Sequence, residues 1–196
     1  MLTMNGEIVI GISGASGVIY GIRLLEELKK KKDITVHLII SEPAKQIIGI
    51  ETDYSYPEVE SLADHTWKID EFTAPVASGS HKTAGMVIIP CSMKTLSSIA
   101  NGFSDTLIGR AADVCLKEDR RLVLVPRETP LSLIDLENMV KVRRAGAAVL
   151  PASPGLYPRP KTVDEMIDFV VGRVLDLFDI EHRLYKRWEQ DNNLKG

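Results

Sequence analysis

The chain has 196 residues, a hydrophobic fraction of 44% and a formal net charge of −3. This length supports one full hydrophobic core, and the nearly balanced charge argues against a nucleic-acid-binding face or a surface for acidic membranes. The two cysteines, Cys91 and Cys115, lack the C-x-x-C spacing of a zinc knuckle and are typical of a reducing compartment. No basic leader or membrane-length apolar stretch is seen, so we predict a cytoplasmic protein that binds neither nucleic acid nor membrane.

The first predicted element is a strand over residues 7–12, followed by the glycine-rich turn 11–17 (G-I-S-G-A-S-G) and a helix over 18–31. The free backbone N–H groups of such a turn and the dipole of the helix make an anion site. Ile12 and Ser13 break the G-x-G-x-x-G register of a dinucleotide site. The turn therefore favours a single phosphate over a pyrophosphate, and the structural alternative is a tight turn with packing glycines.

Apolar runs predict four further strands, over residues 34–40, 86–89, 122–125 and 147–150. Helical spacing predicts helices over residues 106–116, 131–142 and 163–177. Short, continuously apolar strands that alternate with helices indicate a parallel sheet covered on both faces. We predict a doubly wound α/β fold with one domain over residues 1–190 and a polar tail over 191–196.

Two segments do not fit this alternation. Residues 53–80 are polar, aromatic and interrupted by proline, and residues 151–161 contain four prolines. Loops this long in a compact domain tend to be functional, and both segments approach the ends of predicted strands, where α/β proteins place their sites. We therefore predict that both segments form walls of the functional site.

Polar side chains gather directly after the predicted strands. They include Ser13, Ser16, Ser41, Glu42, Ser92, Lys94, Thr95, Arg127, Glu128, Ser153, Tyr157 and Arg159. Because the carboxyl ends of parallel strands meet at one edge of a sheet, these groups predict a polar pocket for an anionic ligand. The adjacent Arg127 and Glu128 favour phosphate binding with acid/base work over a salt bridge within the loop. Ser92 is either a helix N-cap or a ligand donor.

Other polar residues carry weaker signals. Glu51 is either a surface residue at a helix C-terminus or a general base that faces the pocket. The four histidines, at positions 37, 65, 81 and 182, lack metal-ligand spacing, so no metal site is predicted. Trp188, near the end of the chain, is typical of an aromatic anchor on its own domain or on a neighbour.

Three common enzyme classes are disfavoured by the residues themselves. Residues 157–161 match the Y-x-x-x-K pattern of NAD-dependent reductases, but Pro158 and Pro160 prevent the helix that aligns the tyrosine with the lysine. A serine hydrolase needs G-x-S-x-G, and Ala15 replaces the second glycine of the nearest match. Walker-type nucleotide hydrolysis lacks its G-K-[ST] element.

Five motifs occur in order along the chain: GASG at 14–17, ASGS at 77–80, PCSMKTL at 90–96, GRAADV at 109–114 and LVLVPRE at 122–128. Together they resemble the UbiX family of flavin prenyltransferases, which includes the Pad-type B subunits of phenolic-acid decarboxylase systems. The resemblance runs from about Ile8 to Trp188. It implies a three-layer, flavodoxin-like Rossmann fold and a homododecamer whose active sites lie between subunits.

The resemblance also implies roles for individual residues. The residues that match the family's FMN site are Gly14, Ala15, Ser16, Ser41, Ser92, Met93, Lys94, Thr95 and Arg127. The residues that match its dimethylallyl monophosphate site are Lys117, Arg127, Glu128, Tyr157, Arg173 and Trp188. Catalytic roles fall on Ser16 and Glu51, which would assist proton movement, and on Glu128, which would act beside the leaving phosphate.

The reaction that the family carries out is a prenyl transfer. The resemblance implies that reduced FMN is alkylated at N5 as phosphate departs, that a second bond at C6 closes a ring, and that no metal is needed. The product, prenylated FMN, would serve a UbiD-type decarboxylase. Phe72 departs from members that have tryptophan in a D-W-x-A-P context, and a phenyl face stabilises a cation less well than an indole.

Two alternatives remain beside this interpretation. An FMN-dependent cysteine decarboxylase would share the fold and the FMN site, but such enzymes use an active-site histidine, and none of the histidines here lies in a matching motif. A non-catalytic FMN-binding subunit of an aromatic-acid decarboxylase would also bind flavin. Turnover by the isolated protein distinguishes that subunit from an enzyme.

Overall fold

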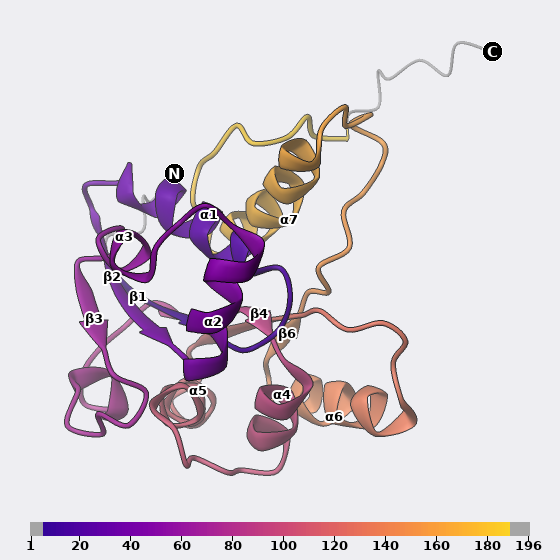
Figure 1. The fold of residues 1–196 in the computed structure, drawn as a ribbon. Helices are drawn as coiled ribbons and strands as arrows, with labels where there is room; N and C mark the ends of the chain where they lie inside the picture. Colours follow the sequence, from indigo (N-terminus) through magenta and orange to yellow (C-terminus); the bar gives the residue numbers. More distant parts are fainter. Residues whose placement is uncertain (1–5, 189–196) are drawn as a thin grey trace.

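The computed structural model of the chain describes residues 6–188, so the predicted tail at 191–196 lies outside the described residues. Parallel strands form one six-stranded sheet in the order β3-β2-β1-β4-β5-β6 (Figure 1). The strands are β1 (Gly6–Ile12), β2 (Ile34–Ile40), β3 (His65–Trp67), β4 (Gly85–Cys91), β5 (Arg121–Pro126) and β6 (Ala148–Val149). The predicted doubly wound α/β fold is confirmed, and it has the flavodoxin-like arrangement.

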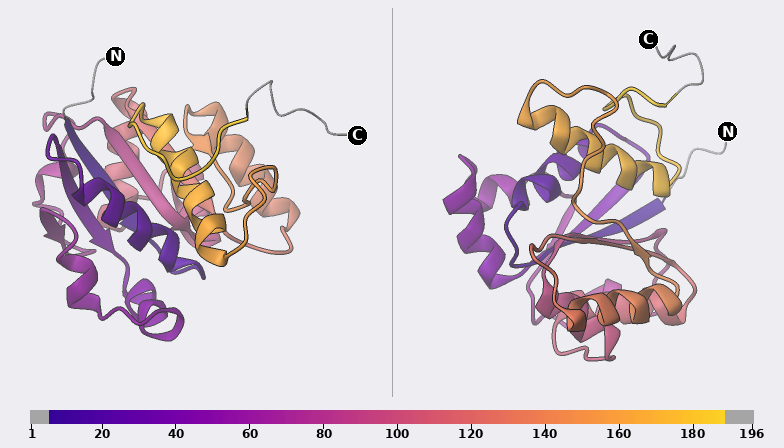
Figure 2. Two further views of the ribbon diagram at one scale, coloured as in Figure 1. Left: turned by 90° about the horizontal axis from the view of Figure 1, so that it is seen from above. Right: turned by 90° about the vertical axis from the view of Figure 1, so that its right-hand side faces the viewer.

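Helices cover both faces of the sheet, which makes three layers (Figure 2, right). One face carries α1 (Val18–Lys29) and α7 (Val163–Leu177), and the other carries α4 (Met93–Ala100), α5 (Leu107–Lys117) and α6 (Leu133–Arg144). Successive side chains of β1 point to opposite faces of the sheet and so belong to two parts of the core. Ile8, Ile10 and Ile12 pack with α1 and α7, whereas Val9 packs with α5. The remaining helices are α2 (Glu42–Glu51), α3 (Tyr56–Glu60) and the 3₁₀ turn η1 (Pro75–Ala77).

The segment 53–80 is more ordered than a loop. It contains α3, the edge strand β3 and η1. β3 has three residues, and His65 and Thr66 are exposed, so it carries no apolar run that would mark a strand in the sequence. It pairs with β2 through a register in which His37 lies opposite His65.

Helix α6 is the least buried of the long helices. The sequence predicts a helix over residues 131–142, and the structure places α6 at Leu133–Arg144, where only Asn138 and Val142 are buried. Leu133 and Ile134 are 71% and 68% exposed. An apolar helix face that the chain's own core leaves uncovered is a surface that a partner can bury.

The order of the strands determines where the sheet can bind a ligand. Strands β2 and β4 lie on opposite sides of β1, so the chain leaves β1 and β4 toward opposite faces and a crevice opens at their carboxyl ends. The glycine-rich turn 11–17 and the loop with Ser92 start from these two strand ends. Among the described residues, no helix has the length and apolar character that crossing a membrane requires.

Candidate functional site

The loops after β1 and β4 are joined by a single buried hydroxyl. Ser13 Oγ donates to the carbonyl of Pro90 at 2.9 Å and accepts from the backbone N–H of Ser92 at 2.8 Å. Gly14 lies against the start of α2, where a Cβ atom would come within 2.6 Å of Pro43. Glycine is therefore required at position 14, and the two loops form one rigid rim.

The N-terminus of α1 binds an anion, and that anion is a side chain. Gly17 has a φ of 95°, which glycine adopts without strain, and its N–H donates to Glu51 Oε2 at 2.7 Å. Glu51 is the last residue of α2, and its carboxylate lies at the helix end where the sequence favours a phosphate. Glu51 is therefore an exposed residue at a helix C-terminus whose side chain contacts the glycine-rich turn, and its role as a general base stays a prediction.

A first cavity, of about 430 Å³, lies at the carboxyl edge of the sheet. Predicted FMN residues on its wall are Gly14, Ser41, Ser92, Met93, Lys94 and Thr95. Ser41 caps α2 by accepting from Ala44 N at 3.3 Å, and Ser92 caps α4 by accepting from Thr95 N at 3.3 Å. Two helix N-termini with hydroxyl groups suit a phosphate.

The first cavity also has an apolar wall. Ile69, Met93 and Ile108 line it beside the polar groups. A cavity of this size with an anion-binding end and an apolar side fits a flavin nucleotide, which combines a phosphate with a planar ring system. Ile69 comes from segment 53–80, as predicted for a site wall. Ser98 and Asp105, which also line the cavity, were missed because neither directly follows a predicted strand.

A second cavity, of about 390 Å³, adjoins the end of β5. Its wall includes Arg127, Glu128, Met139 and Ser153, and Glu128 lies on the wall of both cavities. Arg127 is fixed by Nε, which donates to the carbonyl of Ser16 at 3.0 Å. Segment 151–161 contributes Pro151, Ala152 and Ser153 to this cavity, as predicted. The Arg127-Glu128 pair thus joins the two spaces.

The other predicted substrate residues lie elsewhere in the chain. Tyr157 packs edge-on against Trp188, with ring centroids 5.4 Å apart, and Arg173 donates to Tyr185 Oη at 3.3 Å. Within the described residues 6–188, neither the first nor the second cavity is lined by Tyr157, Arg173 or Trp188. Lys117 ends α5, roughly 12 Å along the helix from Gly109 on the cavity wall at 1.5 Å per residue.

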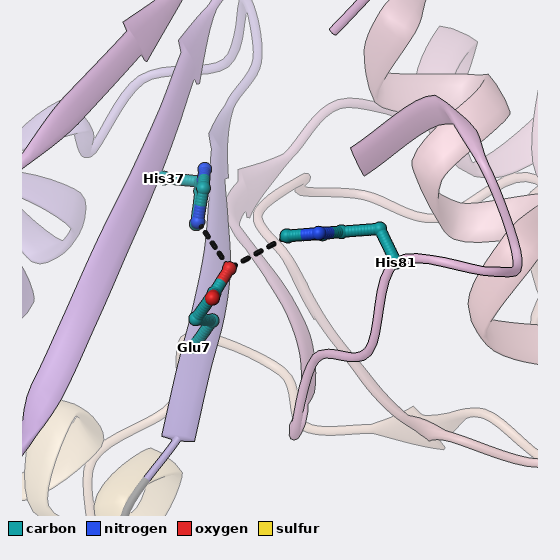
Figure 3. A group of neighbouring side chains, drawn as sticks. All are labelled: Glu7, His37 and His81. Carbon is teal, nitrogen blue, oxygen red and sulfur yellow. Dashed lines mark hydrogen bonds and ion pairs between the residues drawn. The ribbon is translucent and has the colours of Figure 1, made fainter. Parts of the chain in front are cut away.

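A polar cluster at the amino end of β1 was not foreseen. Glu7 Oε2 contacts His37 Nε2 at 2.7 Å and His81 Nε2 at 2.6 Å, so both imidazole rings point at one carboxylate (Figure 3). Burial by itself would raise the pKa of Glu7, but the hydrogen bonds from His37 and His81 outweigh it and hold that pKa below its usual range. Burial lowers the pKa of His37.

The neighbour of His37 decides its tautomer. The indole N–H of Trp67 lies 3.1 Å from His37 Nδ1, and because an indole only donates, neutral His37 carries its proton on Nε2 and donates to Glu7. A metal ion at this cluster would need the lone pair of that nitrogen. Glu7, His37 and His81 are therefore a hydrogen-bonded cluster, and the prediction that the protein needs no metal stays a prediction.

The two cysteines are inert. Cys91 ends β4 and Cys115 lies in α5; both are free and buried. Burial raises the pKa of each thiol to about 12. Neither forms the thiolate that nucleophilic chemistry needs at neutral pH.

The chain is similar to proteins of known family over almost its whole length. A family profile described as Flavoprotein matches residues 3–175. The flavin prenyltransferase UbiX of Halalkalibacterium halodurans is 49% identical over 98% of this chain and 99% of its own. The protein of the same name from Thermoplasma acidophilum is 53% identical over 93% of this chain and 99% of its own.

Solved structures agree with these sequence relatives. A crystal structure of AnUbiX in complex with FMN and dimethylallyl pyrophosphate superposes with a TM-score of 0.92 at 47% identity, covering 95% of this chain and 98% of its own. A dodecameric FMN-dependent UbiX-like decarboxylase from Escherichia coli O157:H7 also reaches 0.92, at 48% identity, with 93% of this chain and 99% of its own covered. The peptidyl-cysteine decarboxylase EpiD, at 21% identity and a TM-score of 0.63, shares the fold alone.

Proposed function

This chain belongs to the flavoprotein family and, within it, to the UbiX flavin prenyltransferases, and from that premise we propose its reaction. The protein joins a dimethylallyl group from dimethylallyl monophosphate to N5 and C6 of reduced FMN. One observation carries this proposal: Glu128 lies on the wall of both cavities, so one acid/base group faces a flavin-sized space and a second space beside it. A simple FMN-binding subunit would need only the first cavity.

The proposed FMN site uses the rim of the first cavity. The hydroxyls of Ser41, Ser92 and Thr95, with the N-termini of α2 and α4, would hold the phosphate, and Ile69 with Met93 would pack on the ring system. When bound, reduced FMN supplies the nucleophilic nitrogen and the carbon that the new ring joins. Ala15 and Ser16 lie in the adjoining turn, where Ser16 is exposed.

The proposed prenyl phosphate site uses Arg127 and Glu128. Because Nε of Arg127 is fixed by Ser16, the guanidinium is preorganised for a phosphate, and a positioned cation stabilises charge on the phosphate as it leaves. Glu128 exchanges a proton with that phosphate. Glu51, held beside Ser16 by the N–H of Gly17, assists proton movement near the flavin.

The proposed site is completed by other subunits. Tyr157, Arg173 and Lys117 suit a phosphate but do not line the chain's own cavities, which is the arrangement expected when neighbouring copies supply them. The exposed apolar face of α6 provides a surface for such contacts. We therefore propose a homo-oligomer, a dodecamer as in the E. coli relative, that passes prenylated FMN to a UbiD-type decarboxylase.

The placement of the histidines supports prenyl transfer over cysteine decarboxylation. His37 and His81 bind Glu7 at the amino edge of the sheet, His65 stacks on His37, and His182 binds Asp176. No described histidine lines either cavity. Neither cavity in the described part of the chain therefore offers the active-site histidine on which an FMN-dependent cysteine decarboxylase relies.

The test is an anaerobic incubation of the protein with reduced FMN and either dimethylallyl monophosphate or dimethylallyl pyrophosphate, followed by mass spectrometry of the extracted flavin. We expect a prenyl adduct of FMN with the monophosphate. If neither phosphate yields an adduct while the protein retains FMN, the prenyltransferase proposal is wrong and a flavin-binding subunit is favoured.

A further inference from the structure

A single carboxylate connects α7 to the chain that follows it. Asp176 Oδ2 accepts from Arg173 Nη1 at 3.0 Å and from the hydroxyl of Tyr185. Asp176 Oδ1 accepts from His182 Nε2 at 3.0 Å and from Arg187 Nη2 at 2.6 Å. A carboxylate has about four lone-pair sites, so these four donors use its whole capacity. We call these five residues the Asp176 cluster.

The Asp176 cluster is charged and preorganised. The Asp176 side chain is only 14% exposed. Burial by itself would raise the pKa of Asp176, but hydrogen bonds from Tyr185, Arg187 and His182 outweigh it and hold that pKa below its usual range. The Nδ1 atom of His182 accepts from Leu184 N at 3.2 Å, so neutral His182 carries its proton on Nε2, which faces Asp176. The carboxylate is thus ionised at neutral pH.

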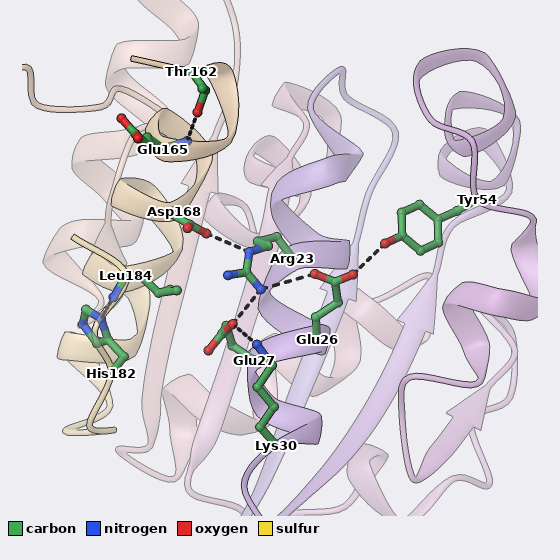
Figure 4. Close-up of polar contacts among 10 residues, drawn as sticks. All are labelled: Arg23, Glu26, Glu27, Lys30, Tyr54, Thr162, Glu165, Asp168, His182 and Leu184. Carbon is green, nitrogen blue, oxygen red and sulfur yellow. Dashed lines mark hydrogen bonds and ion pairs between the residues drawn. The ribbon is translucent and has the colours of Figure 1, made fainter. Parts of the chain in front are cut away.

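The chain after α7 packs tightly on the helix around this carboxylate. A Cβ atom at Gly172 would lie 2.6 Å from the Tyr185 ring and 2.7 Å from the His182 ring, so only glycine permits this approach. Tyr185 also contacts Phe169, whose ring lies 4.8 Å away between centroids. Segment 181–188 is therefore packed closely against α7. Figure 4 shows His182 and Leu184 beside that helix.

Residues assigned to the prenyl phosphate site contact this packed region. Phe169 contacts Tyr157, with ring centroids 5.7 Å apart, and Tyr157 contacts Trp188 at 5.4 Å. Tyr157, Arg173 and Trp188 thus come from three segments: Tyr157 packs on α7, which carries Arg173, and Trp188 reaches Tyr157 from segment 181–188. Arg173 is 47% exposed, and its contacts with Asp176 and Tyr185 both use Nη1.

We propose that Asp176 is a positioning residue for substrate phosphate. By holding Arg173 through Nη1 and fixing Tyr185, His182 and Arg187 around it, Asp176 sets the direction in which the rest of the Arg173 guanidinium faces and keeps Trp188 against Tyr157. This inference rests on the proposed function, since it concerns the affinity for dimethylallyl monophosphate. Asp176 itself lines neither the first nor the second cavity.

The test compares Asp176→Asn with Asp168→Asn. Asp168 lies on the same helix and forms an ion pair of similar burial, with its Oδ1 2.7 Å from Arg23 Nε, but it faces α1 (Figure 4). Both variants lose one ion-paired carboxylate of α7, so a general loss of stability affects both. Only Asp176→Asn releases Arg173.

We expect Asp176→Asn to raise the KM for dimethylallyl monophosphate about tenfold, as loss of charge-assisted positioning typically does, while kcat changes less than about threefold. Calorimetric titration of the oxidised, FMN-loaded protein with dimethylallyl monophosphate should show the same tenfold loss of affinity. The content of FMN and the oligomeric state should match those of the wild type. Asp168→Asn should keep the wild-type KM.

The outcomes separate this inference from the proposed function. An unchanged KM and unchanged calorimetric affinity in Asp176→Asn, with wild-type protein that forms the adduct, would overturn the inference alone. An equal rise in KM for Asp168→Asn would overturn it too, because the effect would then reflect helix stability. Wild-type protein that binds no dimethylallyl monophosphate and forms no adduct would contradict both.

Discussion

The two ends of β1 carry polar groups that are satisfied in opposite ways. At the carboxyl end, Gly14 lines the first cavity together with the hydroxyls of Ser41, Ser92 and Thr95 from the neighbouring strand ends, and Glu128 lines both cavities. At the amino end, Glu7, His37 and His81 bind one another and Trp67 completes the set. Both groups contain residues typical of catalysis, yet only the carboxyl-end group lines the first and second cavities. Residue type alone therefore does not identify a site.

The largest effect is expected at the carboxyl end, from Glu128→Gln. This change removes the group that both cavities share and should lower kcat by about 10²- to 10⁴-fold, the range for general acid–base catalysis. FMN should still co-purify. Stopped-flow measurement of flavin alkylation checks the rate, with Glu42→Gln as the control because Glu42 lines the first cavity but pairs with Lys45 at 2.6 Å. An equal loss of kcat in both variants would mean that the effect comes from the charge of the cavity and not from a specific role of Glu128.

A smaller effect is expected from Arg127→Ala. Loss of a charge-assisted contact costs about 1.5–3 kcal/mol, so the KM for dimethylallyl monophosphate should rise by roughly 10- to 150-fold. Arg110→Ala is the matched control, because Arg110 also donates Nε to a backbone carbonyl, that of Ala77 at 3.0 Å, but lines neither cavity. Steady-state kinetics on both variants decide the point. A wild-type KM in Arg127→Ala would remove this residue from the phosphate site.

Substitution by alanine should have opposite effects on stability at Gly17, in the glycine-rich turn, and at Gly49, in α2. Gly17→Ala should destabilise the fold by about 1–2 kcal/mol, because φ is 95° there and a Cβ atom would lie 3.0 Å from Tyr20. Gly49→Ala, inside α2 with nothing within 4 Å, should stabilise it by about 0.5–1 kcal/mol. Urea denaturation measures both. Equal shifts of the two midpoints would argue against the left-handed conformation at Gly17.

The smallest effect is expected at the amino end, from Glu7→Gln. The lowered pKa of Glu7 gives stability that is present above the pKa of the unfolded chain and is lost as pH falls through the lower folded value. The difference should stay below about 1 kcal/mol, since the Glu7 side chain is 35% exposed and solvent screens it. The difference in urea midpoint between wild type and variant should be present at pH 7, narrow as pH falls below about 4.5, and close only below the lowered folded pKa. Turnover should not change. A large loss of activity would contradict the view that only the carboxyl end of β1 takes part in the reaction.

Much of the first cavity could be predicted from the sequence, because its residues directly follow strands. Ser41, Ser92 and Glu128 are found where an apolar run ends, and a parallel sheet necessarily brings such positions together. The family resemblance, rather than spacing, pointed to FMN. Arg173 came only from that resemblance, whereas Tyr157 follows a predicted strand and Trp188 stands out as an aromatic anchor. No periodicity marks the Asp176 cluster.

The amino-end cluster could not be found by looking for metal-ligand spacing. Glu7 and His37 are 30 residues apart, and His81 is 74 residues from Glu7. The signal that was available is the register: Val9 pairs with His37, and Glu7 lies two residues before Val9, so the two polar side chains share one face of the sheet. A glutamate and a histidine inside two otherwise apolar strands therefore indicated a polar contact within the sheet. Edge strand β3, which supplies Trp67, carries no apolar run and left no comparable signal.

We propose that the two cavities that share Glu128 hold FMN and the prenyl phosphate side by side. The most direct test is a crystal structure of the oxidised, FMN-loaded oligomer with dimethylallyl monophosphate. We expect the flavin in the cavity lined by residues 92–95 and the substrate phosphate within hydrogen-bond distance of Arg127, next to Glu128. A flavin bound elsewhere, or a prenyl phosphate remote from Arg127 and Glu128, would contradict it.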